Sequence, residues 1–370
     1  MMLCAVRTRP LIFSPAAVRW HSGGHDNPLG LPRSGQPVPP QMPRRGGIVK
    51  RSIPNARKVI AVASGKGGVG KSTVAVNLAF SLALNPRNTY VPGQEGGKRR
   101  LRVGVLDLDV FGPSIPTLMG LTESEEPELT AAGALRPLVN HGMPCMSMGF
   151  LLPRPAAPAP TSDDPEPEPA PEPAVVWRGL MVQKAVQQLL FDVDWRTGQW
   201  GFSPASASGS DGGEGLDVLV VDMPPGTGDV PLTLGQLVNV DGAVIVSTPQ
   251  DVALVDVRRG IGMFRKVGVP IIGALLNQSA FYCSNCDTPH EIFGSSDAFT
   301  RTAKRMGVDV LGALPIVGGV SGGGDRGVPF MLTSSGSNSG QGKGEGEKTW
   351  RGVMEDVGDR VWESMNTTKT

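Results

Sequence analysis

The sequence has few cysteines, almost no net charge and no long apolar run. Its 370 residues include 4 Cys, and 35 Lys and Arg nearly balance 34 Asp and Glu. So few cysteines exclude a disulfide framework and indicate a reducing compartment with metal or redox use. The balanced charge gives no support for nucleic-acid binding. Because no apolar stretch approaches the roughly eighteen residues of a membrane-spanning helix, we expect no transmembrane segment.

Acidic residues are absent from the first 25 residues, which carry Arg7, Arg9 and Arg19. A basic, acid-free leader is typical of a mitochondrial transit peptide, whereas a secretory signal would have a longer apolar centre. We therefore predict a transit peptide over residues 1–25, with an ordinary flexible N-terminus as the alternative. Residues 26–56, rich in Pro and Gly, are predicted to form a flexible basic lead-in.

A glycine-rich loop is the most informative feature that the sequence does contain. Residues 65–72 match the phosphate-binding pattern G-x-x-x-x-G-K-[ST], between a β-like run and a helical pattern. The glycines allow backbone N–H groups to surround phosphate oxygens at a helix N-terminus. Lys71 is expected to bind the β and γ phosphates, and Ser72 to bind Mg²⁺. The residues predicted to contact the nucleotide are Gly65, Lys66, Gly67, Gly68, Val69, Gly70, Lys71, Ser72 and Thr73.

Polar side chains follow three of the predicted strands. Asp222 is predicted to bind Mg²⁺ directly or through water, and Asp109 to align the attacking water, because phosphoryl transfer depends on positioning and charge neutralisation. Asp107 and Asp229 are weaker candidates, and a lone Asp after a strand is often only a turn or helix cap. Asn277 follows a third strand, where its amide could contact a purine edge.

Cys283 and Cys286 form a C-x-x-C pair. Two thiolates at this spacing can share a metal, and soft sulfur favours zinc or an iron-sulfur centre. The pair supplies only half of a four-ligand site. A redox dithiol, a zinc site completed by His290, and two cysteines at this spacing by chance therefore remain alternatives. Cys145 is predicted to be a buried apolar thiol, and Cys4 falls within the predicted leader.

Apolar strand-like runs alternate with helical patterns, which predicts a doubly wound α/β fold with a largely parallel sheet. We expect a P-loop ATPase domain over residues 57–332 with disordered inserts at 153–174 and 203–215, a low-complexity linker at 333–349, and a C-terminal helix and tail at 350–370. The predicted strands are 59–63, 102–106, 144–148, 216–221, 243–246 and 271–276, and the predicted helices are 74–84, 179–191, 252–267 and 350–365.

Lys66, directly after the first glycine of the loop, resembles the signature lysine of the deviant Walker A (SIMIBI) ATPases. That resemblance implies a nucleotide-sandwich homodimer in which Lys66 reaches the partner's nucleotide. The loop, together with the segments 109–114, 145–150, 177–179, 221–229 and 283–286, is similar to the Mrp-type iron-sulfur carrier ATPases. This similarity implies slow ATP hydrolysis with Mg²⁺, and Asn277 as an adenine contact. It also makes a 4Fe-4S cluster, bridged by Cys283 and Cys286 of two chains, the leading interpretation of the cysteine pair.

Residues 25–32 resemble the mature start of the mitochondrial members of this family, which are assembly factors for respiratory complex I. The resemblance implies delivery of 4Fe-4S clusters to complex I apoproteins in the mitochondrial matrix. The alternative function is a positioning or regulatory ATPase, zinc-containing or metal-free, that binds protein partners. A metal-free kinase would need an acceptor pocket that the sequence does not identify.

Overall fold

The computed structural model describes residues 49–90, 99–152, 179–196, 214–283, 285–333 and 344–367, all within one unit of residues 48–370. Several predicted segments lie outside the described residues. These are the transit peptide 1–25, the lead-in up to residue 48, the insert 153–174, residues 203–213 of the second insert and residues 334–343 of the linker.

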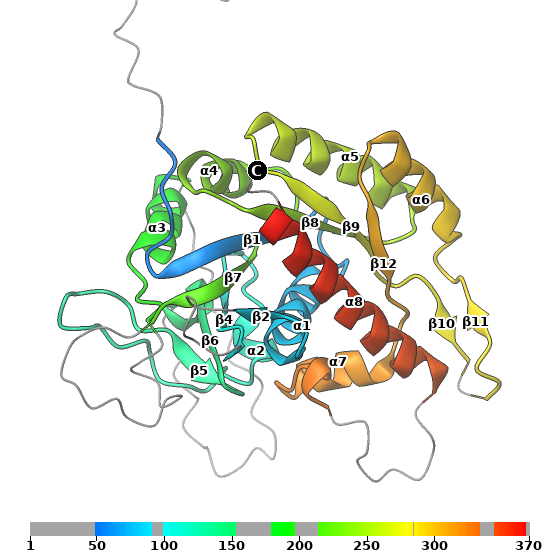
Figure 1. Ribbon diagram of the computed structural model, residues 1–370, viewed down its shortest axis with the longest axis horizontal. Helices are drawn as coiled ribbons and strands as arrows, with labels where there is room; N and C mark the ends of the chain where they lie inside the picture. Colours follow the sequence, from blue (N-terminus) through cyan, green and yellow to red (C-terminus); the bar gives the residue numbers. More distant parts are fainter. Residues whose placement is uncertain are drawn as a thin grey trace, which may run out of the picture. The chain divides into compact units, whose positions relative to one another are not determined.

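An eight-stranded sheet forms the centre of the fold, in the order β12-β9-β8-β1-β7-β4-β6-β5 (Figure 1). All neighbouring strands pair in parallel except β5, which runs antiparallel to β6 at one edge. The predicted doubly wound, largely parallel sheet is confirmed. Its strands are β1 (Ala56–Ser64), β4 (Val103–Asp107), β5 (Leu138–Asn140), β6 (Met143–Ser147), β7 (Leu216–Asp222), β8 (Gly242–Ser247), β9 (Ile271–Leu276) and β12 (Val310–Ala313).

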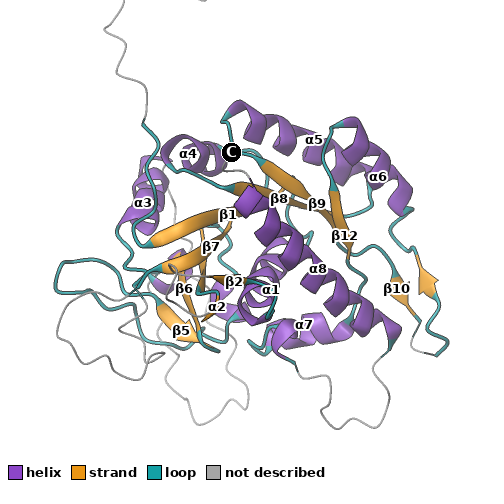
Figure 2. Ribbon diagram, viewed as in Figure 1, coloured by secondary structure: helices purple, strands orange, loops and turns teal. Residues whose placement is uncertain are grey.

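Helices cover both faces of this sheet (Figure 2). On one face lie α1 (Lys71–Leu84) and α8 (Glu345–Thr367). The other face carries α3 (Gly179–Phe191), α4 (Asp229–Leu237), α5 (Asp251–Lys266) and α6 (Ser296–Arg305). Two short helices, α2 (Ile115–Leu118) and α7 (Gly318–Asp325), pack against each other. Smaller elements are β2 (Thr89–Tyr90), β3 (Arg99–Arg100), β10 (Phe281–Tyr282), β11 (Pro289–His290) and the 3-10 turns Met148–Phe150 and Phe330–Leu332.

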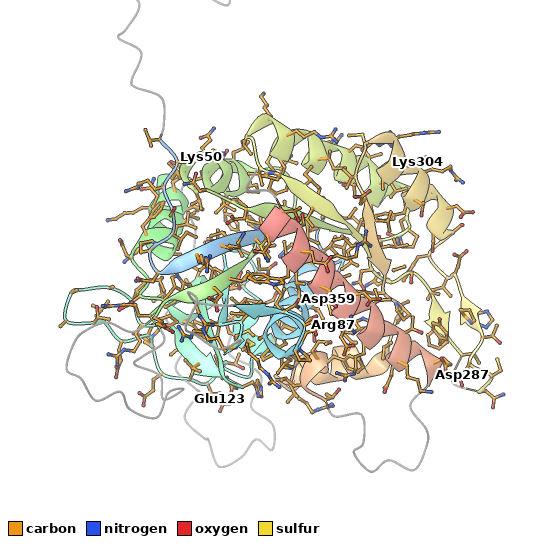
Figure 3. The ribbon with its side chains drawn as sticks, viewed as in Figure 1. Lys50, Arg87, Glu123, Asp287, Lys304 and Asp359 are labelled. Carbon is orange, nitrogen blue, oxygen red and sulfur yellow. The ribbon has the colours of Figure 1, made fainter. Side chains whose placement is uncertain are left out.

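The core lies between the sheet and these helices. Strands β1 and β7 are buried almost throughout and are apolar over residues 59–63 and 218–221, as expected for the centres of parallel strands. Helix α8 contributes Trp350, Met354, Val357 and Val361 to the same core, at the spacing of one helix face. It packs along α1, where Asp359 accepts a hydrogen bond from Arg87 at 2.9 Å (Figure 3). Among the described residues, no helix is long and apolar enough to cross a membrane.

Ordered structure begins earlier than predicted in two places, at the start of the folded domain and at the start of the C-terminal helix. Ile53 is buried, and the Arg51 backbone N–H donates to the Leu237 carbonyl at 2.8 Å, so ordered structure begins before residue 57. Helix α8 begins at Glu345, ahead of its predicted start at residue 350. Acidic residues in its first turn favour this earlier start, because they complement the positive end of the helix dipole.

Candidate nucleotide and cysteine sites

The phosphate loop joins β1 to α1 at the carboxyl edge of the sheet, where open α/β folds bind ligands. Gly70, the last loop residue before α1, has a φ of 79°. A Cβ at this position would lie 2.4 Å from Nδ2 of Asn277, so both the conformation and the space require glycine. The loop therefore presents backbone N–H groups rather than side chains at the helix N-terminus.

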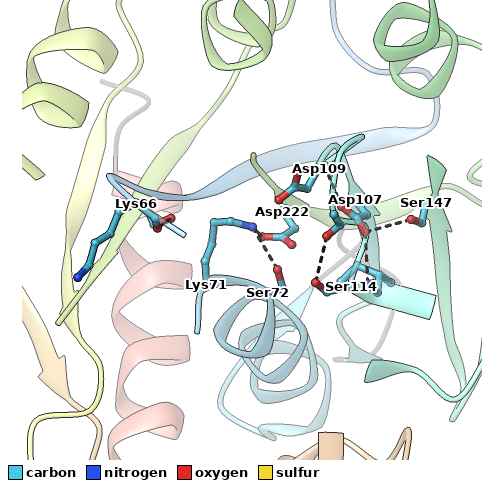
Figure 4. Close-up of polar contacts among 11 residues, drawn as sticks. Lys66, Lys71, Ser72, Asp107, Asp109, Ser114, Ser147 and Asp222 are labelled. Atoms are coloured by element: carbon cyan, nitrogen blue, oxygen red, sulfur yellow. Dashed lines mark hydrogen bonds and ion pairs between the residues drawn. The ribbon is translucent and has the colours of Figure 1, made fainter. Parts of the chain in front are cut away.

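Lys71, Ser72 and Asp222 meet at the start of α1 (Figure 4). The Lys71 ammonium forms a buried ion pair with Asp222 and lies 3.2 Å from Ser72 Oγ. Burial raises the pKa of Asp222, and the Lys71 charge opposes this rise. Oδ2 of Asp222 is buried and has no hydrogen-bond partner among the described residues. A hydroxyl beside a carboxylate oxygen without a partner fits a hard cation such as Mg²⁺.

Asp109 lies in the loop after β4 and lines a cavity of about 490 Å³. The same cavity is lined by Lys66, Lys71 and Ser72, so the structure brings the predicted water-aligning residue to the phosphate loop. Asp109 is half-buried, and this burial raises the pKa of its carboxyl. A carboxylate at this place can accept a hydrogen bond from a water beside a bound phosphate.

Asp107, in contrast, is fully buried and does not line the cavity. It accepts hydrogen bonds from the backbone N–H of Asp109 at 2.9 Å and of Ile115 at 3.3 Å, and from Ser147 Oγ at 3.0 Å. Burial and the nearby Asp222 charge raise its pKa to about 7. Asp107 therefore positions the loop that carries Asp109. The other weak candidate, Asp229, is exposed at the start of α4 and does not line this cavity.

Lys66 and Asn277 both contact their own chain near the loop. Lys66 Nζ donates to Gln250 Oε1 at 2.7 Å, and its side chain also lines the cavity. Asn277 Nδ2 donates to the Val69 carbonyl at 2.8 Å, which places the amide against the backbone of the loop rather than in the cavity. The adenine contact of Asn277 and the reach of Lys66 to a partner's nucleotide stay predictions.

The cysteine pair lies in a small hairpin formed by β10 and β11, beside the N-terminal end of α8 (Figure 1). Cys283 is half-buried and Cys286 is exposed. Hydrogen bonding with the side chain and backbone of Thr288, and to a smaller extent with Cys283, lowers the pKa of Cys286. Within the described part of the chain, no three His, Cys, Asp or Glu residues are grouped to hold a metal ion, so His290 does not complete a site with the pair.

Cys145 is fully buried in β6, which confirms the prediction of a buried apolar thiol, and burial raises the pKa of this thiol.

One wall of the nucleotide cavity is not predicted by the sequence patterns. Thr117 and Leu118 of α2, with Gly324 and Asp325 of α7, line this wall. The only available signal was the glycine run 322–324 directly before Asp325. Glycine runs more often indicate loops than helices, so this signal alone does not predict a helix beside the phosphate loop.

Comparisons with known proteins agree with this arrangement. A family model described as "ParA: NUBPL iron-transfer P-loop NTPase" matches residues 55–161 and 210–344. The iron-sulfur cluster transfer protein NUBPL of Mus musculus is 44% identical over 298 residues, covering 80% of this chain and 78% of the relative.

An iron-sulfur protein of Arabidopsis thaliana, described as required for NADH dehydrogenase and mitochondrial, is 40% identical over 292 residues, covering 79% and 77%. Among solved structures, a nucleotide-binding protein from Archaeoglobus fulgidus in complex with ADP has 30% identity and a TM-score of 0.53. The match covers 74% of this chain and 87% of that one.

Proposed function

Because this chain belongs to the family of NUBPL iron-transfer P-loop NTPases, we propose that it is an ATP-dependent carrier that delivers 4Fe-4S clusters to complex I subunits. The observation that carries this proposal is the presence, on one chain, of a phosphate-loop site and a cysteine pair of which Cys283 is half-buried and Cys286 is exposed. Relatives described as a cluster transfer protein and as a protein required for NADH dehydrogenase support the cargo and the recipient. The mitochondrial relative and the acid-free leader support import into the matrix, with residues 1–25 as the transit peptide.

In the nucleotide site, the backbone N–H groups of the loop bind the phosphates, and the Lys71 ammonium moves from Asp222 to the β and γ phosphates. Ser72 and Asp222 would hold Mg²⁺, which supplies charge neutralisation between those phosphates. Asp109 accepts a hydrogen bond from the attacking water and orients it toward the γ phosphate. The partial burial of Asp109 and the fixed loop behind it support this positioning role.

In the cluster site, Cys283 and Cys286 supply two thiolates, and a second copy of the chain supplies two more across a twofold axis. The lowered pKa of Cys286 favours the thiolate that iron requires. Lys66 reaches the nucleotide of the partner subunit in this homodimer. Slow ATP hydrolysis then changes the dimer geometry and loosens the cluster for transfer.

Anaerobic reconstitution with iron and sulfide tests both halves of the proposal. Wild-type protein is expected to turn brown with about four iron per dimer. Cys283→Ala should abolish iron binding and keep ATP binding, whereas Lys71→Ala should do the reverse, because the two sites use different residues. The control is Cys145→Ala, which removes a thiol that is buried and distant from solvent.

A colourless dimer loaded with zinc would instead favour a positioning or regulatory ATPase, and equal loss of both activities in both variants would indicate misfolding.

A further inference from the structure

The nucleotide cavity continues past the phosphate loop to a wall made by α2 and α7. Lys71 and Ser72 line one part of the cavity, and Thr117, Leu118 and Asp325 line another part of the same space. A nucleoside triphosphate bound by its phosphates at Lys71 must place its sugar and base elsewhere in this cavity of about 490 Å³, or in solvent.

This wall is held in place by close backbone packing. A Cβ on Gly327, just after α7, would lie 2.2 Å from the Cα of Gly120, just after α2. The backbone segments that follow the two helices are therefore in direct contact. The Gly327 carbonyl lies 2.7 Å from Nε2 of His141, and Asn140 Nδ2 donates to the Met119 carbonyl at 2.7 Å. The β5–β6 turn thereby fixes both helices.

Helix α7 forms although its sequence, Gly-Gly-Val-Ser-Gly-Gly-Gly-Asp, has a low intrinsic helix propensity. Each interior glycine costs about 1 kcal/mol relative to alanine. Two of the glycines lie in close contact with other segments: a Cβ on Gly323 would lie 2.7 Å from the Val328 carbonyl oxygen, and a Cβ on Gly324 would lie 2.9 Å from Cδ2 of Leu118. Packing against α2 therefore determines where the C-terminal end of α7, and with it Asp325, lies in the cavity wall.

The charge of Asp325 restricts what it can bind. Its carboxylate is exposed and has no hydrogen bond or ion pair with the other described residues. An anion repels phosphate oxygens, and Asp325 belongs to no group of three or more acidic, His or Cys residues in the described chain that could hold a metal ion. The remaining partners in a nucleotide are neutral hydrogen-bond donors.

We propose that Asp325 accepts hydrogen bonds from the 2′ and 3′ hydroxyls of the nucleotide ribose and so selects ribonucleotides. In dinucleotide-binding folds, a carboxylate likewise accepts a hydrogen bond from a ribose hydroxyl. Thr117 lines the same wall and carries a second polar side chain there. This inference rests on the proposed binding of ATP at the phosphate loop.

Equilibrium binding of Mg-ATP and Mg-2′,3′-dideoxyATP to the full chain tests this role. The wild type is expected to bind ATP at least about 10-fold more tightly than the dideoxy analogue, because hydrogen bonds to a charged acceptor are strong. In Asp325→Ala the two affinities should agree within about 2-fold, while the affinity for the dideoxy analogue stays unchanged. The control is Glu123→Ala, which removes an exposed carboxylate that does not line the cavity.

Each outcome decides the inference. Loss of the preference in Asp325→Ala, with a normal affinity for dideoxyATP, supports it and shows that the phosphate site is intact. Equal binding of both nucleotides by the wild type, or a preference that persists in Asp325→Ala, overturns it while ATP binding stands. If the wild type binds neither nucleotide, the proposed function fails with it.

Discussion

Three carboxylates at the strand ends have different roles because each is surrounded by different groups. Asp222 pairs with Lys71, Asp109 faces the cavity, and Asp107 is buried against backbone N–H groups. Asp107 and Asp222 are the last residues of β4 and β7, and Asp109 lies two residues after Asp107. Sequence patterns therefore predicted all three as candidates, with Asp107 as a weaker one. Its positioning role depends on Ser147 from β6, a contact that no local pattern reveals.

The pKa of about 7 for Asp107 predicts a pH dependence of stability. The folded chain retains the Asp107 proton between roughly pH 4 and pH 7, where the unfolded chain has lost it. The free energy of unfolding therefore falls as pH rises through this range. Asp107→Asn should make the fall smaller by roughly 2–4 kcal/mol, as measured by urea unfolding at pH 4.5 and pH 7.5.

The matched control is Glu125→Gln, which removes an exposed carboxyl and should leave the fall at its wild-type size. An Asp107→Asn variant with an unchanged pH profile would contradict a protonated Asp107.

At the scale of elements, sequence patterns located five of the parallel strands within one residue, because the centre of a buried parallel strand is apolar. Strand β1 begins three residues before its predicted start, since Arg57 and Lys58 interrupt the apolar pattern there. Helices α2, α4, α6 and α7 were not predicted. Proline in α2 and α4 and glycine in α7 oppose helix formation locally, and tertiary contacts outweigh this preference. Asp325 was not predicted as a site residue for the same reason, since its place in the cavity wall depends on α7 being a helix.

Two of the three glycines of helix α8, Gly352 and Gly358, lead to opposite predictions. A Cβ on Gly358 would lie 2.4 Å from Oγ of Ser81 in α1, whereas a Cβ on Gly352 meets no atom within 4 Å. Gly352→Ala should raise the free energy of unfolding by about 0.5–1 kcal/mol through helix propensity. Gly358→Ala should lower it by about 1–3 kcal/mol, because the added methyl group overpacks the contact between the two helices.

Urea unfolding of the two variants beside wild type measures both changes in one experiment. Each variant serves as the other's control for the effect of alanine in α8. If Gly358→Ala also stabilised the chain, the close packing of α8 on α1 would be wrong.

For the whole molecule, the proposed function requires communication between the nucleotide and the cysteine hairpin. Asn277 connects the two sites, because it is hydrogen-bonded to the phosphate loop and lies in the chain segment that leads to the cysteine hairpin. Its amide contacts Val69 of the phosphate loop at 2.8 Å, and the chain continues from Asn277 directly into the hairpin that carries Cys283. A shift of the loop on hydrolysis would therefore act on the segment that leads to the sulfurs.

The proposed homodimer makes the last prediction, because each nucleotide would be bound by Lys71 of one subunit and Lys66 of the other. Lys71→Ala and Lys66→Ala should each nearly abolish ATP hydrolysis when pure. In a mixed dimer, the subunit with Lys66→Ala keeps its own Lys71 and receives an intact Lys66 from its partner. Random pairing of equal amounts should then restore about a quarter of wild-type activity, since half of the dimers are mixed and each has one complete site. Steady-state ATPase assays of the pure and mixed variants measure this recovery, with Lys304→Ala, an exposed lysine of α6, as the control that should be fully active alone. If mixing restores nothing although the variants exchange subunits, Lys66 acts on its own chain, as its contact with Gln250 in this structure also allows.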